Sequence, residues 1–259
     1  MPQLLSLQPL TLEQLPTPTT AELSTPGART ALDDLIAQLT REANSLLSTL
    51  TDPSKRDSSP DPSVWKSGKT FNQSTIPTRS YSAHDPAGLV PDHEGRRWFA
   101  RISNHPGADY DKWRSGLLLD HSENEVRYIE SCTQAERLHS IVPNKLEVWT
   151  TQYHLAFPTS NRDFTFAILT SEQEAGVEPS AARSFTVVSV PFHAPSRSGF
   201  VRAKYVSVEH VIQTQDGVKW VMATASDAAG LVPKFISDMA MPSKIAEDVP
   251  SFQSWILKQ

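Results

Sequence analysis

FVRAKYVSVEHVIQ (residues 200–213) and VKWVMATAS (218–226) are both typical of β-strands, and the turn TQDG (214–217) joins them. Within that turn, Asp216-Gly217 between two apolar runs is a strong hairpin signal. A long amphipathic helix follows from about Leu231. Because it follows a hairpin, this helix can lie across a curved sheet. We therefore expect an internal cavity bounded by a wide sheet and one long helix.

The composition narrows the class of protein. The 259 residues are enough for one large domain or two small ones, and long enough to bury a sizeable core. Much of the proline lies before residue 110, which favours an ordered C-terminal two-thirds behind a looser N-terminal third. The net charge of −5 argues against nucleic-acid binding, which needs clustered Lys and Arg.

Cysteine usage and the N-terminal sequence bear on the compartment. The single cysteine, Cys132, excludes an intrachain disulfide and a cysteine-based zinc site. The start MPQLLSLQPLTLEQLPTP lacks the basic region of a secretion signal. No apolar run reaches the roughly 18 to 20 residues of a membrane span. We expect a cytoplasmic protein that makes at most transient membrane contact.

The pattern along the chain predicts four segments. They are a flexible leader over residues 1–28, an N-terminal helix over 29–51, a polar linker over 52–63 and one domain over 64–259. The leucines of the leader could still dock on the domain. The helix has an apolar face formed by Leu32, Leu35, Ile36, Leu39, Ala43, Leu46, Leu47 and Leu50. This face either packs on the domain or binds a partner.

The domain itself is predicted to be α+β. We expect strands over 96–105, 125–130, 146–157, 164–169 and 185–192 before the hairpin, and a short helix over 109–121. Short loops between consecutive strands imply an antiparallel sheet. The prediction is a helix-grip fold, in which a curved antiparallel sheet wraps around the long C-terminal helix and the N-terminal helix is an addition. Pro242 and Pro250 are expected to break or kink the C-terminal helix.

Four stretches resemble a known group. They are RRWFARISNHPG (96–107), AFPTSNRDFTFAIL (156–169), VRAKYVSVEHV (201–211) and KWVMATASDAAGLVPKFISDMAMPSKIAEDVPSFQSWI (219–256). Together they resemble the START-like superfamily of lipid-transfer domains, and most closely the fungal DUF3074 family. The resemblance implies the helix-grip fold and a cavity for an apolar ligand. It does not by itself imply catalysis.

Motifs for cofactor and metal chemistry are missing from the sequence. It contains no Gly-x-Ser-x-Gly elbow, phosphate-binding glycine loop, dinucleotide fingerprint or His-Glu-x-x-His spacing. The eight histidines are scattered. We therefore expect no cofactor and no metal.

Three residues are candidates for proton transfer. A histidine side chain can shuttle a proton, which makes His154 a candidate, and Tyr205 and Glu209 share one face of their strand. The alternative for each is a purely structural role, either at the surface or in the core with its hydrogen bonds satisfied within the protein. Which face of that strand points inward is left open by the sequence, because both faces are mixed.

Other side chains are candidates for ligand contact. Trp220, Met222 and Thr224 share a strand face that suits the wall of a cavity for a lightly oxygenated apolar ligand. Arg162 either holds a turn or grips an anionic head group or enolate oxygen. The full set of expected ligand-binding residues is Trp149, Tyr153, Arg162, Arg202, Trp220, Met222, Thr224, Phe235 and Met239.

Two functions fit these observations. The first is binding of one hydrophobic small molecule, such as a lipid, sterol, terpenoid or polyketide. The alternative is a cofactor-independent fungal biosynthetic enzyme, a cyclase, isomerase or pericyclase, that uses the same cavity. Inward-pointing titratable groups would favour the enzyme, whereas an almost wholly apolar wall would favour a carrier. The sequence leaves the ligand and the oligomeric state open.

Overall fold

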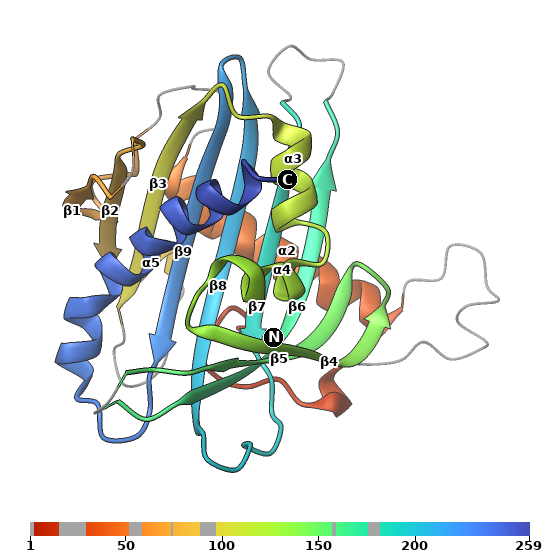
Figure 1. The fold of residues 1–259 in the computed structure, drawn as a ribbon. Coiled ribbons are helices and arrows are strands. Elements are labelled where there is room, and N and C mark those ends of the chain that lie inside the picture. The colour runs from red at the N-terminus through yellow and green to blue at the C-terminus, as the bar shows by residue number, and fades with distance from the viewer. Residues whose placement is uncertain are drawn as a thin grey trace.

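A computed structural model describes residues 3–15, 30–51, 59–73, 75–88, 97–156, 159–175 and 182–259 (Figure 1). Its strands are β1 (Lys66–Phe71), β2 (Thr78–Ala83), β3 (Trp98–Pro106), β4 (Cys132–Val142), β5 (Leu146–Tyr153), β6 (Arg162–Gln173), β7 (Ser184–Pro191), β8 (Val201–Thr214) and β9 (Gly217–Asp227). Its helices are α2 (Ala31–Leu50), α3 (Tyr110–Leu117), α4 (His121–Tyr128) and α5 (Lys234–Ile256), with short 3₁₀ turns η1 (Leu12–Gln14) and η2 (Pro86–Gly88).

The nine strands form one sheet with the order β1-β2-β3-β9-β8-β7-β6-β5-β4. All neighbours in this order are antiparallel, and the start of β6 also pairs in parallel with the start of β8. Most strands are joined by short connections, as the sequence predicts. The predicted α+β helix-grip class is confirmed: an antiparallel sheet carries the long C-terminal helix α5 and an extra N-terminal helix.

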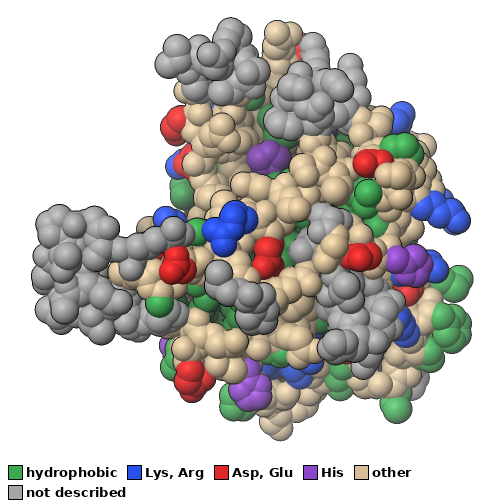
Figure 2. All heavy atoms as spheres, turned by 180° about the vertical axis from the view of Figure 1, so that it is seen from behind, with side chains coloured by type: hydrophobic (Ala, Val, Ile, Leu, Met, Phe, Trp, Pro, Cys, Tyr) green, Lys and Arg blue, Asp and Glu red, His purple; other side chains and the backbone are tan. Residues whose placement is uncertain are grey.

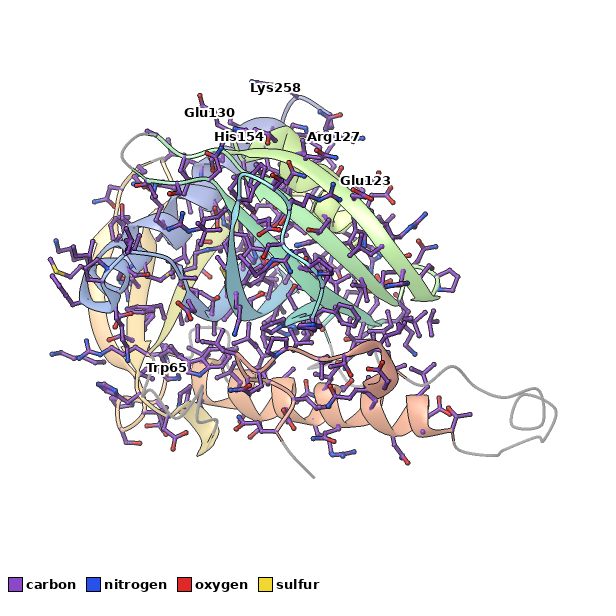
Figure 3. All side chains as sticks on the ribbon, turned by 90° about the horizontal axis from the view of Figure 1, so that it is seen from below. Trp65, Glu123, Arg127, Glu130, His154 and Lys258 are labelled. Carbon is purple, nitrogen blue, oxygen red and sulfur yellow. The ribbon has the colours of Figure 1, made fainter. Side chains whose placement is uncertain are left out.

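The sheet buries both of its faces. On one side α3, α4 and α5 cover it, and on the other side lies α2 (Figures 1 and 3). Side chains alternate between two core clusters along β8, because successive residues of a strand point to opposite faces. Val206 and Val208 belong to the cluster under α2, whereas Tyr205 and Val211 belong to the cluster under α3 and α5. We call these the outer and inner faces.

The helix α2 packs on the outer face through its leucines. Thr30 caps it, with a reciprocal capping box to Asp33. Leu39, Leu46 and Leu50 are fully buried. The apolar face predicted for this helix is thus directed at the sheet. Seen from behind in Figure 2, acidic, basic and hydrophobic side chains are interspersed over the described part of this side of the molecule.

Residues 3–15 also lie on the outer face. Glu42 of α2 accepts hydrogen bonds from the backbone N–H groups of Leu4 (3.0 Å) and Leu5 (2.7 Å). Leu10 forms a parallel bridge to Phe192 beyond β7. The leucines of the leader therefore dock on the domain. Residues 16–29 and most of the expected linker over 52–63 lie outside the described residues, and the proposed division at 28, 51 and 63 stays a prediction.

The hairpin β8–β9 requires glycine in its turn. Gly217 has φ 149°, a region that L side chains rarely adopt, and it pairs with Pro106 and Thr214. A Cβ at this position would lie 2.1 Å from the carbonyl oxygen of His105. The backbone of β3 therefore approaches the turn too closely for any other residue.

One segment differs from the sequence prediction. Residues 125–130 were expected as a strand, but most of them belong to the helix α4, and the next strand begins at Cys132. Glu123 in the first turn and Arg127 in the last turn complement the helix dipole. Eight residues are too few for helical periodicity to stand out against a strand pattern.

The helix α5 is continuous through both of its prolines, so neither of them breaks it, and the alternative of a kink stays a prediction. Proline removes one backbone hydrogen bond and disfavours a helix interior. Ile245, Val249 and Phe252 are nevertheless buried against the inner face. Their packing outweighs the local preference, because tertiary context routinely overrides propensity. Within the described chain, no helix is both long and apolar enough to cross a bilayer.

Candidate functional site

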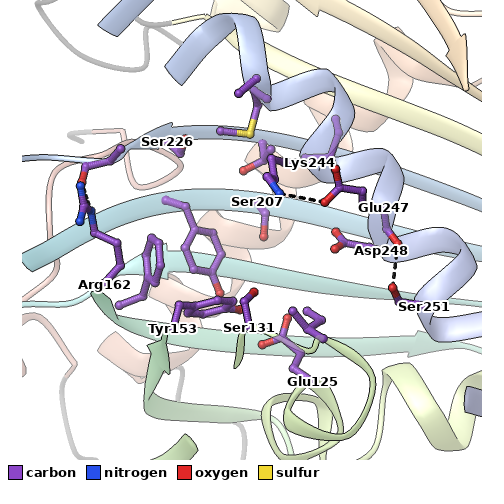
Figure 4. A pocket seen from close by; sticks show the side chains of 18 of the residues that line it. Glu125, Ser131, Tyr153, Arg162, Ser207, Ser226, Lys244, Glu247, Asp248 and Ser251 are labelled. Atoms are coloured by element: carbon purple, nitrogen blue, oxygen red, sulfur yellow. Dashed lines mark hydrogen bonds and ion pairs between the residues drawn. The ribbon is translucent and has the colours of Figure 1, made fainter. Parts of the chain in front are cut away.

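A cavity of about 1100 Å³ lies between α5 and the inner face of the sheet. Its wall is formed by β3, β8 and β9, by α4 and α5, and by the ends of β5 and β6 (Figure 4). Ordinary small-molecule sites fall at about 300–1,000 Å³, so this cavity has room for one large ligand. The inner face of this sheet is only partly filled by its helices.

Strand register decides which side chains form the floor. Residues Tyr205, Ser207 and Glu209 of β8 lie opposite Ser226, Thr224 and Met222 of β9, respectively. All six line the cavity, as does Trp220 at the end of the β9 row. The face of β8 that carries Tyr205 and Glu209 is therefore the inner one.

Aromatic rings form one side of the wall. Phe164 packs edge-on against Tyr153 and Tyr205, with ring centroids 5.3 and 5.4 Å apart. Burial raises the pKa of both tyrosines well above the ordinary value. Their hydroxyl groups therefore stay protonated at neutral pH, and they add to the hydroxyl groups of Ser207, Thr224 and Ser226 in the same wall.

The opposite end of the cavity holds a polar cluster in which two cationic side chains are buried and three carboxyl groups are partly exposed. We call it the inner cluster: Arg101, His121, Glu125, Glu209 and Asp248. Arg101 is 1% exposed, and its guanidinium carbon lies 3.7 Å from the centre of the Trp220 ring. Its Nη2 is 3.9 Å from Glu209 Oε2, beyond hydrogen-bond distance. Its Nε and Nη1 are buried and have no hydrogen-bond partner within the part of the chain that the structure describes.

The two glutamates of the inner cluster hold His121 in its charged form. His121 Nε2 lies 3.6 Å from Glu125 Oε1 and 3.9 Å from Glu209 Oε1, while Nδ1 donates to the Leu117 carbonyl. Burial lowers the pKa of His121, but Glu125 and Glu209 outweigh it and raise the pKa to about 9. Glu209 also accepts a hydrogen bond from Trp220 Nε1 at 2.9 Å.

Asp248 enters the cavity from α5, and Glu125 faces the same space from α4 (Figure 4). Burial raises the pKa of Asp248 to about 7, although the positive charge of Arg101 opposes this. No hydrogen bond or ion pair reaches the Asp248 carboxyl from any described residue. A carboxyl group donates a hydrogen bond only when it is protonated and accepts in either form.

A turn lines the cavity at the end away from the inner cluster. Arg162 donates from Nε to the Ala228 carbonyl at 2.7 Å and from Nη1 to the Ser160 carbonyl. It thereby joins the turn before β6 to the loop between β9 and α5. Arg162 lines the cavity, but its donors are directed largely at backbone oxygens.

The sequence and fold match known proteins. Residues 98–256, more than half of the chain, match the family described as proteins of unknown function, DUF3074. This chain belongs to the DUF3074 family. It is 25% identical over 186 residues to the uncharacterized protein C577.11 of Schizosaccharomyces pombe. The aligned region covers 67% of this chain and 74% of that protein.

Solved structures share the fold of this DUF3074 protein. Human StAR-related lipid transfer protein 5 matches with a TM-score of 0.63 and 17% identity, over 87% of this chain and 98% of its own. A STAR-related lipid transfer protein from Xanthomonas axonopodis has a TM-score of 0.57 and 17% identity, and the match covers 75% of this chain and 99% of that one. Human STARD10 has a TM-score of 0.56 and 13% identity, and the match covers 76% of this chain and 74% of that one. The START-like resemblance and the family predicted from the sequence are confirmed.

The structure brings many of the expected site residues of this DUF3074 protein to the cavity. The residues that line it are His154, Tyr205, Glu209, Tyr153, Arg162, Trp220, Met222 and Thr224. The three catalytic candidates do not meet, however. His154 lies just beyond β5, is exposed, and contacts Asn161 and the ring of Phe200. In Figure 3 it lies near Glu130 on the side of the sheet opposite α2.

Four expected ligand-binding residues do not line the cavity. Trp149 is packed in the core and donates its indole N–H to Glu147 (3.0 Å). Arg202 points to the outer face, where it binds the Asp163 carboxylate. Phe235 and Met239 are 65% and 79% exposed, because this side of α5 faces solvent. We do not include these four in the proposed site.

Sequence reasoning missed most of the inner cluster. Alternation along the predicted strand over 96–105 puts Arg101 on the same face as Arg97 and Phe99, with no sign that this face is enclosed. Two signals were available. Asp248 interrupts the apolar stripe of Ile245, Val249 and Phe252, and His121 precedes Glu125 by one helical turn. Among the described residues, no group of three or more His, Cys, Asp or Glu side chains is arranged to hold a metal ion.

Proposed function

We propose that this DUF3074 protein binds one hydrophobic small molecule, of the lipid, sterol, terpenoid or polyketide kind, in the cavity under α5. The observation that carries the proposal is the cavity of about 1100 Å³, whose wall combines aromatic and aliphatic side chains with hydroxyl groups and ends in a polar cluster. Such a combination suits a large apolar ligand with few polar groups. The lipid-transfer names of proteins with the same fold support it.

Native mass spectrometry of the purified protein, followed by organic extraction, tests this proposal. We expect one apolar molecule per chain in the extract. The comparison variant is Ser207→Phe, which places a ring in the cavity from its floor. This variant should yield no apolar molecule on extraction. Wild-type protein that remains empty after contact with apolar extracts would contradict the proposal.

Cofactor-independent catalysis in the same cavity is a second candidate. It is favoured by the convergence of Glu209, His121 and Glu125, since a carboxylate held beside a charged imidazole is suited to proton transfer. A cyclase or isomerase would use Glu209 as its base. The test is deuterium uptake from D₂O at the carbon next to the carbonyl of an apolar ketone. Uptake that is catalysed by the wild type and lost in Glu209→Gln would support catalysis, and equal uptake would reject this role.

Brief membrane contact, which ligand exchange with a membrane requires, is part of the proposal. Leu231, Phe235 and Met239 are 99%, 65% and 79% exposed, and they flank Val232 and Ile236 of the cavity wall. Exposed apolar groups beside an opening favour contact with a lipid surface. Flotation with neutral phosphatidylcholine vesicles should show weak binding that Phe235→Ser with Met239→Ser removes. Binding unchanged in this double variant would contradict this contact surface.

A further inference from the structure

Residues 3–15, which we call the strap, are tied to the loop that joins β7 and β8. Leu10 exchanges two backbone hydrogen bonds with this loop: its N–H donates to the Pro191 carbonyl (2.8 Å), and its carbonyl accepts from the His193 N–H (2.7 Å). The Leu10 side chain is buried in the core on the outer face. Glu42 of α2 holds the start of the strap through two backbone N–H groups. The strap is therefore fixed at both of its ends.

The loop between β7 and β8 is held in turn by side chains of β6 and β8. Arg202 donates from Nη1 to the Ala194 carbonyl (2.8 Å) and from Nη2 to the Pro195 carbonyl (2.9 Å). Asp163, which pairs with Arg202, accepts from the backbone N–H of Arg197 (3.0 Å). Asp163 is the second residue of β6 and is fully buried. The loop is thus fixed to the start of β6 on the outer face.

Arg162, the first residue of β6, makes a similar contact on the inner face, because successive strand residues point to opposite faces. It donates from Nε to the carbonyl of Ala228 (2.7 Å), which lies in the loop between β9 and α5 and lines the cavity. In this loop Ala229 has φ 52° and Gly230 has φ 65°. The left-handed conformation is costly for alanine and persists only where surrounding contacts hold it. Arg162 provides one of these contacts.

The start of β6 therefore holds the strap-bound loop on one face and the loop before α5 on the other. We propose that docking of the strap keeps the loop before α5 in place, so that release of the strap loosens the N-terminal half of α5. The strap is the element with two states, docked and released, that such coupling requires. The coupling itself needs no ligand. Its consequence, faster release of a molecule from the cavity, rests on the proposed function.

Hydrogen–deuterium exchange of the full-length protein, measured by mass spectrometry, tests the coupling. Two variants weaken the strap at separate points. Leu10→Ala removes a buried side chain, and Glu42→Gln removes the charge that accepts the backbone N–H groups. In both variants we expect exchange in the strap and over residues 228–240 to rise about threefold or more, as is usual for coupled sites. Exchange over residues 245–256, in the buried half of α5, should not change.

The matched control is Leu50→Ala. Leu50 is also fully buried in the core on the outer face, but it is the last residue of α2, where Thr49 binds Trp65. The variant makes the same chemical change in the same core without touching the contacts of the strap. It should therefore leave exchange over residues 228–240 at the wild-type rate. Equal acceleration in Leu50→Ala and Leu10→Ala would overturn the inference.

Arg162→Met tests whether the coupling passes through the start of β6. Loss of the donor to Ala228 should itself raise exchange over residues 228–240. Adding Leu10→Ala should then have little further effect, because two changes that act through one set of contacts are not additive. Fully additive effects would overturn the proposed role of Arg162.

The remaining outcomes are equally decisive. A strap that exchanges faster while residues 228–240 do not would overturn the inference. A strap unchanged in both variants would overturn it as well, because the named contacts would not hold the strap.

The effect on the cavity is measured with an uncharged fluorescent probe, 1-decylpyrene, which is loaded into the protein and transferred to phosphatidylcholine vesicles in a stopped-flow instrument. Transfer should be faster from Leu10→Ala than from the wild type, and equal rates would overturn the effect on the cavity. If no probe binds although the exchange results hold, the proposed function fails and the coupling stands.

Discussion

Asp163 has a fully buried side chain that depends on Arg202. Its Oδ2 accepts from Arg202 Nη2 at 2.6 Å and from the backbone N–H of Arg197 at 3.0 Å, and its Oδ1 accepts from Arg202 Nε at 3.0 Å. Burial raises the pKa of Asp163, but these hydrogen bonds outweigh it and hold the pKa below its usual range. The carboxylate therefore stabilises the start of β6, next to the turn that lines the cavity.

Asp163→Asn should lower the free energy of unfolding by about 2–4 kcal/mol, because the amide leaves Arg202 without its charged partner. Urea denaturation at pH 7 measures it. Since the folded pKa is depressed, this stability is present above the unfolded pKa of about 3.9 and is lost as pH falls through the folded pKa. Asp111→Asn, at a pair whose carboxylate is 69% exposed, should change the stability by about 1 kcal/mol or less. Equal effects of the two variants would contradict this role.

Asp248 should make the protein less stable as pH rises. Its folded pKa of about 7 lies above the unfolded value of about 3.9, so the folded state binds the proton more tightly. The resulting stabilisation is complete below about pH 4 and is lost as pH rises to about 7. Asp248→Asn should remove this dependence, so that the variant gains stability relative to the wild type between pH 5 and pH 8. Urea denaturation measures the free energy of unfolding of both proteins. A difference between them that stays constant from pH 5 to pH 8 would show that the fold does not favour the protonated carboxyl group.

At the scale of elements, α5 has two halves with different roles. The C-terminal half is buried against α3 and α4. Phe252 packs edge-on against Trp113 and Tyr128, and Ile256 lies next to Gly116. The N-terminal half exposes Phe235 and Met239, and its other side closes the cavity. The helix is therefore fixed at one end, and movement that admits a ligand is expected at the other.

The contact between α3 and α5 allows no side chain at Gly116. A Cβ there would lie 2.8 Å from Phe252 Cε2 and 3.0 Å from Ile256 Cδ1. Gly116→Ala should lower the free energy of unfolding by about 1–2 kcal/mol, because overpacking exceeds the gain in helix propensity. Ser115→Ala, on the exposed side of the same helix, should change it by about 0.5 kcal/mol or less. A stabilised Gly116→Ala variant in urea denaturation would mean that α5 can shift without loss.

At the scale of the whole molecule, adding a phenyl ring in the cavity and adding one in the core under α2 should have opposite effects on stability. Ser207 of β8 faces the cavity, and its neighbour Val208 faces the outer core. Ser207→Phe should keep or raise the melting temperature of the empty protein and reduce binding of an apolar probe, hexadecyl methyl ether, at least about tenfold. Val208→Phe should destabilise by about 1–3 kcal/mol or more, because that core is closely packed. Destabilisation of both variants to the same extent would indicate that the cavity is not open space.

Much of the architecture could be predicted from local patterns. Asp216-Gly217 located the hairpin, the leucine face located α2, and the stretch after Leu231 located α5. These signals depend on backbone preferences and on the period of apolar residues, which neighbouring residues determine. The short helix α4 and the continuity of α5 through Pro242 and Pro250 were not predicted, because packing on the inner face decides both.

The sequence by itself determined the fold class and the family. It also determined which residues of a strand share a face, because side chains alternate along a strand whatever its neighbours are. Only the tertiary structure decided which set points inward, since that depends on which face α5 covers. The same holds for the inner cluster. Arg101, His121, Glu209 and Asp248 come from β3, α4, β8 and α5, and nearly 150 positions separate the first from the last. Strand register and the crossing of α5 bring them together, and no local pattern in the chain encodes either one.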